Sequence, residues 1–143
     1  MKQMGEKGRE VRIGVVGVGG RGYGQMLTLL GMPDVRVAAV CDVYPDRVAR
    51  AQKGAAAKQG FEPDGYADYR ALNRRDDIEA VVIMTSWQTH AQIAVDAMAC
   101  GKYAAMEVGG AASVGECWQL IRTSETTGKP CMMLENCCYG LEE

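Results

Sequence analysis

The stretch RIGVVGVGGRGYGQ (Arg12–Gln25) decides the fold, because a β-rich apolar run passes directly into a series of glycines. The run Val11–Val16 predicts a buried strand, and a helix is expected from about Gly22 to Leu30. Between them, the residues Gly17–Gly22 match the pattern G-x-G-x-x-G. A strand that leads through such a turn into a helix is typical of the first βαβ unit of a nucleotide-binding fold.

Each glycine of this pattern has a mechanical role. Gly17 permits the tight turn, Gly19 lacks the Cβ that would keep a phosphate from the main chain, and Gly22 lets the helix pack close to the strand. The N–H groups at the start of the helix attract an anion. A kinase loop would need a V-A-I-K strand, and a Walker A loop would need Lys after its last glycine, where Tyr23 stands here. A purely structural turn is the remaining alternative.

Asp42 supplies the second half of this fingerprint. It ends the next predicted strand, Val35–Cys41, about 20 residues after Gly22, where a carboxylate binds both hydroxyls of an adenosine ribose. The same charge repels a 2′-phosphate, so NAD is favoured over NADP, although Arg47 nearby opposes this preference. A solvated turn acid is the alternative for Asp42. The sequence therefore predicts a dinucleotide site that includes Gly17, Gly19, Gly20, Arg21, Gly22 and Asp42.

The rest of the chain alternates between apolar runs and helical patterns. Further strands are expected at Ile78–Thr85, Tyr103–Glu107 and Cys131–Glu135; helices are expected from Pro45 to about Lys58, at Tyr69–Asn73, at His90–Ala99, and between the cap Ser113 and the stop Gly128, with a loop at Gly60–Asp68. Strands that are apolar throughout and are separated by helices indicate a parallel sheet covered on both faces. We therefore predict an α/β fold of one domain, a doubly wound parallel sheet of the Rossmann type.

Polar clusters follow three of these strands, where α/β sheets bind their ligands. They are Thr85-Ser86-Trp87-Gln88-Thr89-His90, Glu107-Val108 and Glu135-Asn136. The structural alternatives are a helix cap at Thr89, a packed Trp87 and a core-edge His90. Because all three clusters converge on one crevice, the functional interpretation is favoured.

Composition excludes several classes of protein. The 143 residues carry a net charge of −2, which gives nucleic acid no basic surface. No apolar run approaches the roughly 20 residues of a membrane helix, and the first ten residues lack the apolar core of a secretory signal, so a cytoplasmic protein is expected. The six cysteines (Cys41, Cys100, Cys117, Cys131, Cys137 and Cys138) include no C-x-x-C pair. Buried reduced thiols and no metal site are expected; metal or redox chemistry is the alternative.

Three segments carry a resemblance to a known family: RIGVVGVGGRGYG, AVCDVYPDR and TSWQTHAQIAVDAMACGKYAAMEV. With Asn136, they resemble the N-terminal domain of the Gfo/Idh/MocA family of sugar-handling, NAD(P)-dependent oxidoreductases, from about Val11 to Gly140. The family usually has Glu-Lys-Pro where this chain has Glu107-Val108-Gly109, and that lysine commonly assists proton transfer. Glu-Val, Trp-x-x-His and ECWQLIRTSETTGKPCMMLENCCYG resemble instead its branch of NAD-dependent α-N-acetylgalactosaminidases, although Gly109 stands where that branch has Pro.

The resemblance implies how NAD is bound. Arg21 and Gly22 would meet the diphosphate, and Asp42 the adenosine ribose. The nicotinamide side would be lined by Thr85, Trp87, Gln88, Thr89 and His90, with Glu107 and Val108 at the nicotinamide ribose, Asn136 near the nicotinamide and Tyr139 as a further neighbour. In the glycosidase branch, NAD would take a hydride from the sugar and return it after elimination of the glycosidic bond.

The resemblance also implies a second domain that supplies the sugar pocket and the proton-transfer groups. We expect a flexible N-terminus at residues 1–10, the Rossmann domain at 11–143, and a substrate domain that this sequence lacks. The catalytic residues are then unknown, with His90 as the one candidate here, and this chain alone is expected to be inactive and to expose an apolar face that favours a homo-oligomer. Three functions stay open: the NAD-binding part of a sugar or polyol dehydrogenase, that of an NAD-dependent glycosidase, and a non-catalytic NAD sensor.

Overall fold

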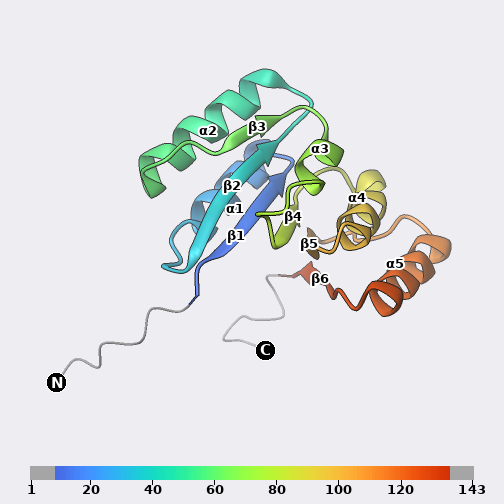
Figure 1. Cartoon of the computed structure of the whole chain (residues 1–143). Coiled ribbons are helices and arrows are strands. Elements are labelled where there is room, and N and C mark those ends of the chain that lie inside the picture. Colours follow the sequence, from blue (N-terminus) through green and yellow to red (C-terminus); the bar gives the residue numbers. More distant parts are fainter. Residues whose placement is uncertain (1–8, 136–143) are drawn as a thin grey trace, which may run out of the picture.

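The computed structural model describes residues 9–135, which fold around one parallel sheet (Figure 1). Its strands lie in the order β3-β2-β1-β4-β5-β6, and every neighbouring pair is parallel. Their bounds are β1 (Val11–Val16), β2 (Val35–Cys41), β3 (Asp64–Tyr66), β4 (Ala80–Ile83), β5 (Tyr103–Glu107) and β6 (Cys131–Leu134). The chain builds outward from β1 to β3 and then returns to β4 on the other side of β1. The doubly wound Rossmann-type sheet predicted from the sequence is confirmed.

Helices cover both faces of this sheet. They are α1 (Gly20–Leu29), α2 (Pro45–Gln59), α3 (Tyr69–Asn73), α4 (Trp87–Ala99) and α5 (Val114–Thr127). One core cluster contains Met26 of α1 and Ala51 of α2, whereas the other contains Leu72 of α3, Met98 of α4 and Leu120 of α5. Figure 1 shows α2 alongside β2 and β3, and α4 and α5 on the side of β5 and β6. Two separate helical layers therefore sandwich the sheet.

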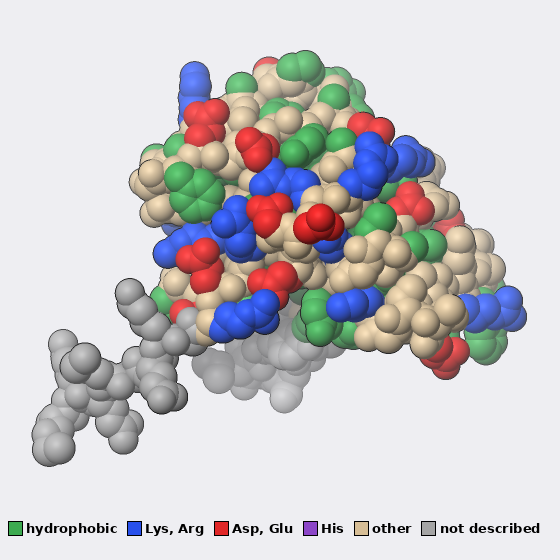
Figure 2. All heavy atoms as spheres, viewed as in Figure 1, with side chains coloured by type: hydrophobic (Ala, Val, Ile, Leu, Met, Phe, Trp, Pro, Cys, Tyr) green, Lys and Arg blue, Asp and Glu red, His purple; other side chains and the backbone are tan. Residues whose placement is uncertain are grey.

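The strands are buried because both of their faces meet helices. In β1, Val15 points into the cluster with α1 and α2, and Val16 into the cluster with α3 and α4; their side chains are 0% and 3% exposed. Alternating residues of one strand thus fill two cores, which explains apolar runs without a polar face. On the outer surface in Figure 2, acidic and basic side chains are interspersed.

Most predicted elements are confirmed, but three sets of bounds differ. The strand expected at Ile78–Thr85 is shorter and spans Ala80–Ile83. The expected loop Gly60–Asp68 contains the short edge strand β3, whose residues Asp-Gly-Tyr have no apolar pattern and pair only with β2. The helix expected at His90–Ala99 begins earlier, at Trp87, directly after its N-cap Ser86, whose side chain makes no capping hydrogen bond. By contrast, the Ser113 side chain accepts a hydrogen bond from Glu116 N–H at 3.2 Å, as the capping-box spacing predicted.

The cysteines depart in part from the prediction of buried thiols. Cys41 is buried and Cys131 half-buried, but Cys100 and Cys117 are exposed, because they lie at the end of α4 and on the outside of α5. Burial raises the pKa of the Cys41 thiol to about 12. Within residues 9–135, no three side chains of the metal-binding types come together, and no helix has the length and apolarity to cross a membrane. Cys137 and Cys138 lie outside the described residues.

Candidate functional site

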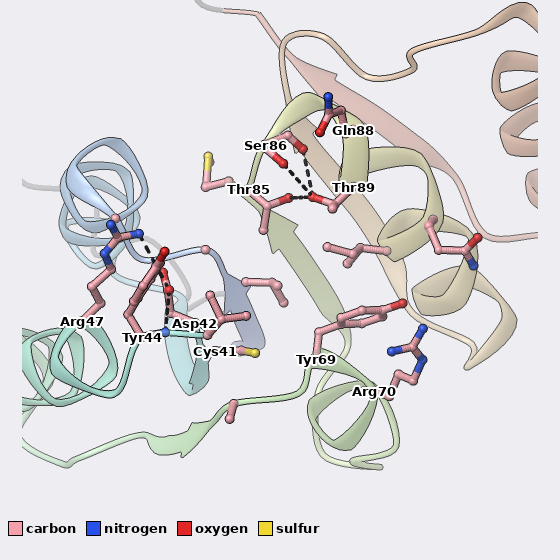
Figure 3. Close-up of a pocket in the computed structure, with 18 residues that line it drawn as sticks. Cys41, Asp42, Tyr44, Arg47, Tyr69, Arg70, Thr85, Ser86, Gln88 and Thr89 are labelled. Carbon is pink, nitrogen blue, oxygen red and sulfur yellow. Dashed lines mark hydrogen bonds and ion pairs between the residues drawn. The ribbon is translucent and has the colours of Figure 1, made fainter.

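A cleft of about 800 Å³ lies at the carboxyl ends of the strands, where the chain reverses direction across the sheet. It is lined from one side by Gly17, Gly19, Asp42 and Arg47, and from the other by Thr85, Ser86, Gln88 and Thr89. Figure 3 shows Asp42, Tyr44 and Arg47 facing Thr85 and Thr89 across the opening, with Tyr69 and Arg70 at a third side. This is the position at which open α/β sheets bind ligands.

The glycine turn has the geometry that its sequence predicted. Gly17 has φ +88°, and a Cβ there would lie 2.7 Å from the Met84 main chain. A Cβ on Gly22 would lie 1.9 Å from the Gly17 carbonyl oxygen, so only glycine allows α1 to approach β1. At Gly19 the nearest atom to an added Cβ is Arg47 Nη1 at 3.5 Å, and at Gly20 nothing lies within 4 Å. Those two glycines therefore leave open space instead of serving a contact within the protein.

Hydrogen bonds hold this turn from behind. Asp42 Oδ2 accepts from Val18 N–H at 3.0 Å, and Arg50 Nη2 donates to the carbonyl oxygens of Val18 and Gly19 at 2.9 and 3.1 Å. In the described part of the chain, the N–H groups of Gly19 and Gly20 have no protein acceptor. The carbonyl oxygens of Val18 and Gly19 thus accept hydrogen bonds within the protein, while the N–H groups of Gly19 and Gly20 are left to donate to an anion.

Arg50 is a residue that the sequence analysis missed. It lies on α2, and its guanidinium also stacks on the Tyr23 ring of α1 at 4.5 Å. It comes three residues after Arg47, which places both on one face of the helix, and this spacing was the available signal. Tyr44, also missed, lines the cleft and carries the Arg47 guanidinium at 4.3 Å from its ring centre.

The Asp42 carboxylate is buried at the end of β2, with its side chain 6% exposed. Oδ1 accepts from Tyr44 N–H at 3.1 Å and lies 3.8 Å from Arg47 Nη1, while Oδ2 accepts from Val18 N–H. A carboxylate oxygen accepts more than one hydrogen bond, so both oxygens retain capacity toward the cleft. This arrangement suits a pair of donors such as neighbouring ribose hydroxyls.

Across the cleft, hydroxyl groups gather at the start of α4. Thr89 Oγ1 lies 2.8 Å from Thr85 Oγ1 and 2.9 Å from the Ser86 carbonyl oxygen. His90 is fully buried beneath them; its Nε2 lies 3.0 Å from the Thr85 carbonyl oxygen, and its Nδ1 has no partner in residues 9–135. Because a carbonyl oxygen can only accept a hydrogen bond, Nε2 is the ring nitrogen that carries the hydrogen toward it. His90 thus supports the floor of the cleft and is absent from its lining.

Glu107 and Arg21 form an ion pair beside the cleft. Arg21 Nε donates to Glu107 Oε2 at 2.5 Å, and Val108 N–H donates to Oε1 at 3.0 Å. The hydrogen bond from Arg21 holds the pKa of the Glu107 carboxyl below its usual range, against the opposing effect of burial. The two residues come from the first turn of α1 and the end of β5, so the pair joins the glycine turn to the other half of the sheet.

Trp87 and Gly109 lie against each other on the same side. Gly109 has φ +79°, and a Cβ there would lie 2.6 Å from three carbons of the Trp87 ring. The Trp87 side chain is otherwise open, with 65% of its surface exposed. A proline, whose φ is fixed near −65°, could not take this conformation of Gly109.

The structure thus brings together most of the predicted residues, in three groups. Gly17, Gly19, Asp42, Thr85, Gln88 and Thr89 line the cleft itself; Gly20, Arg21, Gly22, Glu107, Val108 and Trp87 lie at the start of α1 or at neighbouring strand ends; His90 lies beneath. Asn136 and Tyr139 lie outside the described residues. The contacts predicted for each residue with a cofactor remain predictions.

Comparison with known proteins gives a family for this arrangement. Residues 11–135 match the sequence pattern of an oxidoreductase family with an NAD-binding Rossmann fold, Gfo/Idh/MocA. The chain is 42% identical over 137 residues to an alpha-N-acetylgalactosaminidase of Shewanella oneidensis, and 41% identical over 140 residues to a glycosyl hydrolase family 109 protein of Solibacter usitatus. Each match covers 93% of this chain but only 30% and 32% of the relative, so the chain spans about a third of their length.

A solved structure shares the fold as well. An oxidoreductase from Agrobacterium radiobacter, in complex with NAD⁺, L-tartaric acid and magnesium, superposes with a TM-score of 0.78 at 27% identity, over 89% of this chain and 36% of that one. The glycine turn and the carboxylate at the end of β2 are thus the features expected of the NAD-binding Rossmann fold that the family match describes.

Proposed function

Because this chain belongs to the Gfo/Idh/MocA oxidoreductase family and carries its NAD-binding Rossmann domain, we propose that it is the cofactor part of an enzyme that acts on a carbohydrate by hydride transfer. NAD supplies the hydride chemistry when bound, and the protein supplies binding and orientation. The observation that carries the proposal is the cleft in which two bare glycines with available N–H groups lie next to a buried carboxylate.

The adenosine diphosphate half of NAD fits the first side of this cleft. The diphosphate would lie against Gly19 and Gly20, where no Cβ intrudes and the N–H groups and the dipole of α1 favour negative charge. Asp42 would accept from the ribose hydroxyls and repel a 2′-phosphate, which favours NAD over NADP. Arg47, 3.8 Å from Asp42, already compensates that carboxylate in part and thereby reduces the discrimination.

The nicotinamide half would extend toward the ends of β4 and β5. Thr85, Gln88 and Thr89 would offer polar contacts there, and Trp87 and Val108 apolar ones. His90 would act from below, through the Thr85 carbonyl group, because its ring does not reach the cleft. Among the described residues that line the cleft, those that follow β4 therefore offer side chains for binding but no carboxylate, lysine or histidine.

Between a dehydrogenase and a glycosidase, two observations favour the glycosidase. The relatives at 41–42% identity are named as glycosidases, and Val108 occupies the position at which the family resemblance implies a proton-transferring lysine. A valine holds no proton. We therefore propose that the enzyme cleaves α-N-acetylgalactosaminides with recycled NAD, and that a sugar or polyol dehydrogenase is the second candidate, supported by the oxidoreductase family as a whole.

We also propose that a separate substrate domain completes the enzyme. The relatives are about three times as long as this chain, and the cleft provides no group positioned for proton transfer to a sugar. Residues 11–135 would then bind NAD, while the sugar pocket and the acid and base would come from the additional domain.

The test extends the chain with the coding sequence downstream of Glu143 and supplies NAD⁺ with a chromogenic α-N-acetylgalactosaminide and, separately, with free sugars. Release of the chromophore without accumulation of NADH supports the glycosidase. NADH accumulation with a free sugar supports the dehydrogenase instead. Binding of NAD⁺ without either reaction would favour a non-catalytic sensor and contradict both enzyme proposals.

A further inference from the structure

The outer side of α5 carries an apolar pattern that a surface helix normally turns toward its own core. Positions i, i+3, i+4 and i+7 share one face of a helix, and here they hold Val114, Cys117, Trp118 and Ile121, which form the α5 stripe. All four residues are exposed, Trp118 by 55% of its surface. Leu120 is the buried residue of α5, and it joins the core cluster that includes α4. The α5 stripe therefore points away from the core of its own chain.

A groove of about 470 Å³ lies beside this stripe and is lined mostly by apolar side chains. It shares Cys117 and Ile121 with the α5 stripe, and Met133 with the strand β6. Within residues 9–135, β6 pairs only with β5, and its sequence Cys-Met-Met-Leu carries no charge of the kind that keeps an edge strand from pairing. The stripe, the groove and Met133 thus form one apolar surface, the α5–β6 face, at the end of the sheet in Figure 1.

The cleft and the α5–β6 face are separate surfaces, because the linings of the cleft and of the groove share no residue. The proposed substrate domain is required at the cleft, where the sugar would meet the cofactor. It does not account for a stripe that extends over two turns of α5, from Val114 to Ile121. The α5–β6 face therefore needs an occupant of its own, and an exposed apolar surface of this kind marks a site of protein association.

Two copies of the α5 stripe fit each other when the helices run antiparallel, which is the arrangement that a two-fold axis across them produces. With the axis between positions 117 and 118, Val114 of one copy lies opposite Ile121 of the other. Cys117 then lies opposite Trp118 of the second copy. Because Cys117 lines the groove, the indole of each copy is placed to enter the groove of its counterpart. A tryptophan buried in this way contributes strongly to an interface.

The charged residues at the end of α5 favour the same arrangement. Arg122 and Glu125 lie at or after the C-terminal end of the stripe, and both are exposed. Parallel helices would set each of these charges against its like in the second copy. Antiparallel helices place the charges at opposite ends of the pair and bring the two helix dipoles head to tail, which is the favourable orientation. Charge thus selects the pairing in which the stripe is complementary to itself.

We propose that the α5–β6 face joins two copies of this chain in a symmetric dimer, with antiparallel α5 helices and Trp118 of each copy in the groove of the other. Every contact across the two-fold axis then occurs twice, as in other symmetric dimers. The dimer leaves both clefts open, because no residue of the cleft lining belongs to the groove. Assembly and cofactor binding are therefore independent properties of the chain.

Sedimentation of this chain over a range of concentrations tests the dimer. We expect a monomer–dimer equilibrium, and Trp118→Glu should raise its dissociation constant about 100-fold, because a charge replaces the central apolar side chain. Gln119→Glu is the matched control: it introduces the same charge at the next position, which is exposed but lies outside the stripe, and should leave the dissociation constant unchanged. If Trp118→Glu does not fold, Val114→Glu places the charge at the most exposed residue of the stripe, 73% exposed.

Thiol labelling of the unaltered chain identifies the surface that is covered. Cys117 and Cys100 are both exposed, but only Cys117 belongs to the α5–β6 face. The labelling of Cys117, followed by mass spectrometry, should slow in proportion to the fraction of dimer, while that of Cys100 stays constant.

Three results would overturn the proposal. They are a monomer at every concentration up to the solubility limit, a dimer that Trp118→Glu and Val114→Glu leave intact, and labelling of Cys117 that does not depend on concentration. Protection of Cys117 in a monomeric extended chain would also overturn it, because the substrate domain would then cover the α5–β6 face. None of these results depends on whether the cleft binds NAD.

Discussion

The two halves of the sheet build their parts of the cleft in different ways. On the side of β1 and β2, the site is main chain: a glycine turn whose carbonyls bind Arg50 and whose Val18 N–H binds Asp42. On the side of β4 and β5, the site consists of side chains, with hydroxyl groups at the start of α4 and an indole that is 65% exposed. The groups of the first half are therefore held by hydrogen bonds within this chain, whereas the second half presents side chains that are in part exposed, Trp87 above all.

Exposed apolar side chains occur in both halves of the sheet; on the side of β1 and β2 they include Val43 and Tyr44. Beyond β5, the α5–β6 region exposes large apolar side chains, namely Val114, Trp118, Ile121, Met132 and Met133, each 47–73% exposed. Next to them, a groove of about 470 Å³ is lined by Leu120, Cys131 and Met133 among others. The two halves thus differ in how they are built: a local main-chain turn on one side, and exposed side chains beside a second groove on the other.

The sharpest way to break the first half is to add one carbon atom to Gly22. We expect Gly22→Ala to destabilise the fold by about 3 kcal/mol or more, because its Cβ would lie 1.9 Å from a main-chain oxygen that has no room to move. Thermal unfolding measures the loss. Gly24→Ala, two residues along the same helix and with nothing within 4 Å of its Cβ, is the control and should be neutral or stabilising. Equal stability of the two variants would contradict the role assigned to Gly22.

Asp42→Ala tests the single carboxylate of that half. We expect NAD⁺ affinity to fall roughly 10–100-fold, because hydrogen bonds to a charged group contribute about 1.5–3 kcal/mol and the variant also releases Val18 N–H. NADP⁺ should lose much less, since it no longer meets the opposing charge. Calorimetry with both cofactors measures the difference. Asp46 is an exposed acid in the first turn of α2, so Asp46→Ala should change neither affinity. An unchanged NAD⁺ affinity in Asp42→Ala would contradict the assignment of Asp42 to the ribose.

The contrast between the halves also explains what the sequence could predict. The main-chain half follows local rules, glycines at fixed spacing and a carboxylate at a strand end, so the turn at Gly17, the close approach at Gly22 and the position of Asp42 after β2 were predictable. Arg50 was missed because its partners are carbonyl groups some 30 residues away along the chain, which no local pattern records. The capping box at Ser113 was predictable for the same reason that the glycines were, since both its partners lie within one turn.

In the second half, tertiary contacts override local signals. His90 follows a polar stretch at a strand end, which pointed to the cleft, but the turn of α4 directs its ring into the interior and against the Thr85 carbonyl group. Because that helix begins at Trp87 and not at His90, residues 87–89 belong to its first turn and not to the preceding loop. The pairing of Glu107 with Arg21 joins strands and helices 86 residues apart, and could be found only from the fold.

Gly109→Ala addresses the second half alone. The new Cβ would displace the Trp87 ring and would also hold a strained positive φ, so we expect a loss of about 1–2 kcal/mol in stability. NAD⁺ affinity should fall about threefold while ADP affinity stays constant, because the first half is untouched. Trp87 fluorescence, measured in a Trp118→Phe background, should report the displaced ring. A parallel loss of ADP affinity would show that the two halves of the cleft are not separable in this way.

The smallest effect on stability is expected from the ion pairs at the amino ends of the strands, which join the two halves of the sheet. Arg75 binds Asp64 of β3 and Asp77 just before β4, and Arg12 of β1 lies 2.7 Å from Asp77. The hydrogen bond from Arg75 lowers the pKa of Asp77 from its ordinary 3.8 to about 2. A carboxyl whose pKa is depressed by folding stabilises the fold above its unfolded pKa, and that contribution is lost as the pH falls from about 4 toward 2.

Asp77→Asn should remove this part of the acid sensitivity. Because the Asp77 side chain is 41% exposed, solvent screens the pair and the variant should cost less than about 1 kcal/mol at neutral pH. Its unfolding free energy should then decline less steeply than that of the parent protein between pH 4 and 2, and NAD⁺ affinity at neutral pH should not change. Asp76→Asn, at the neighbouring position, should retain the parent's slope. If both variants followed the parent curve, the acid sensitivity between pH 4 and 2 would come from groups other than Asp77.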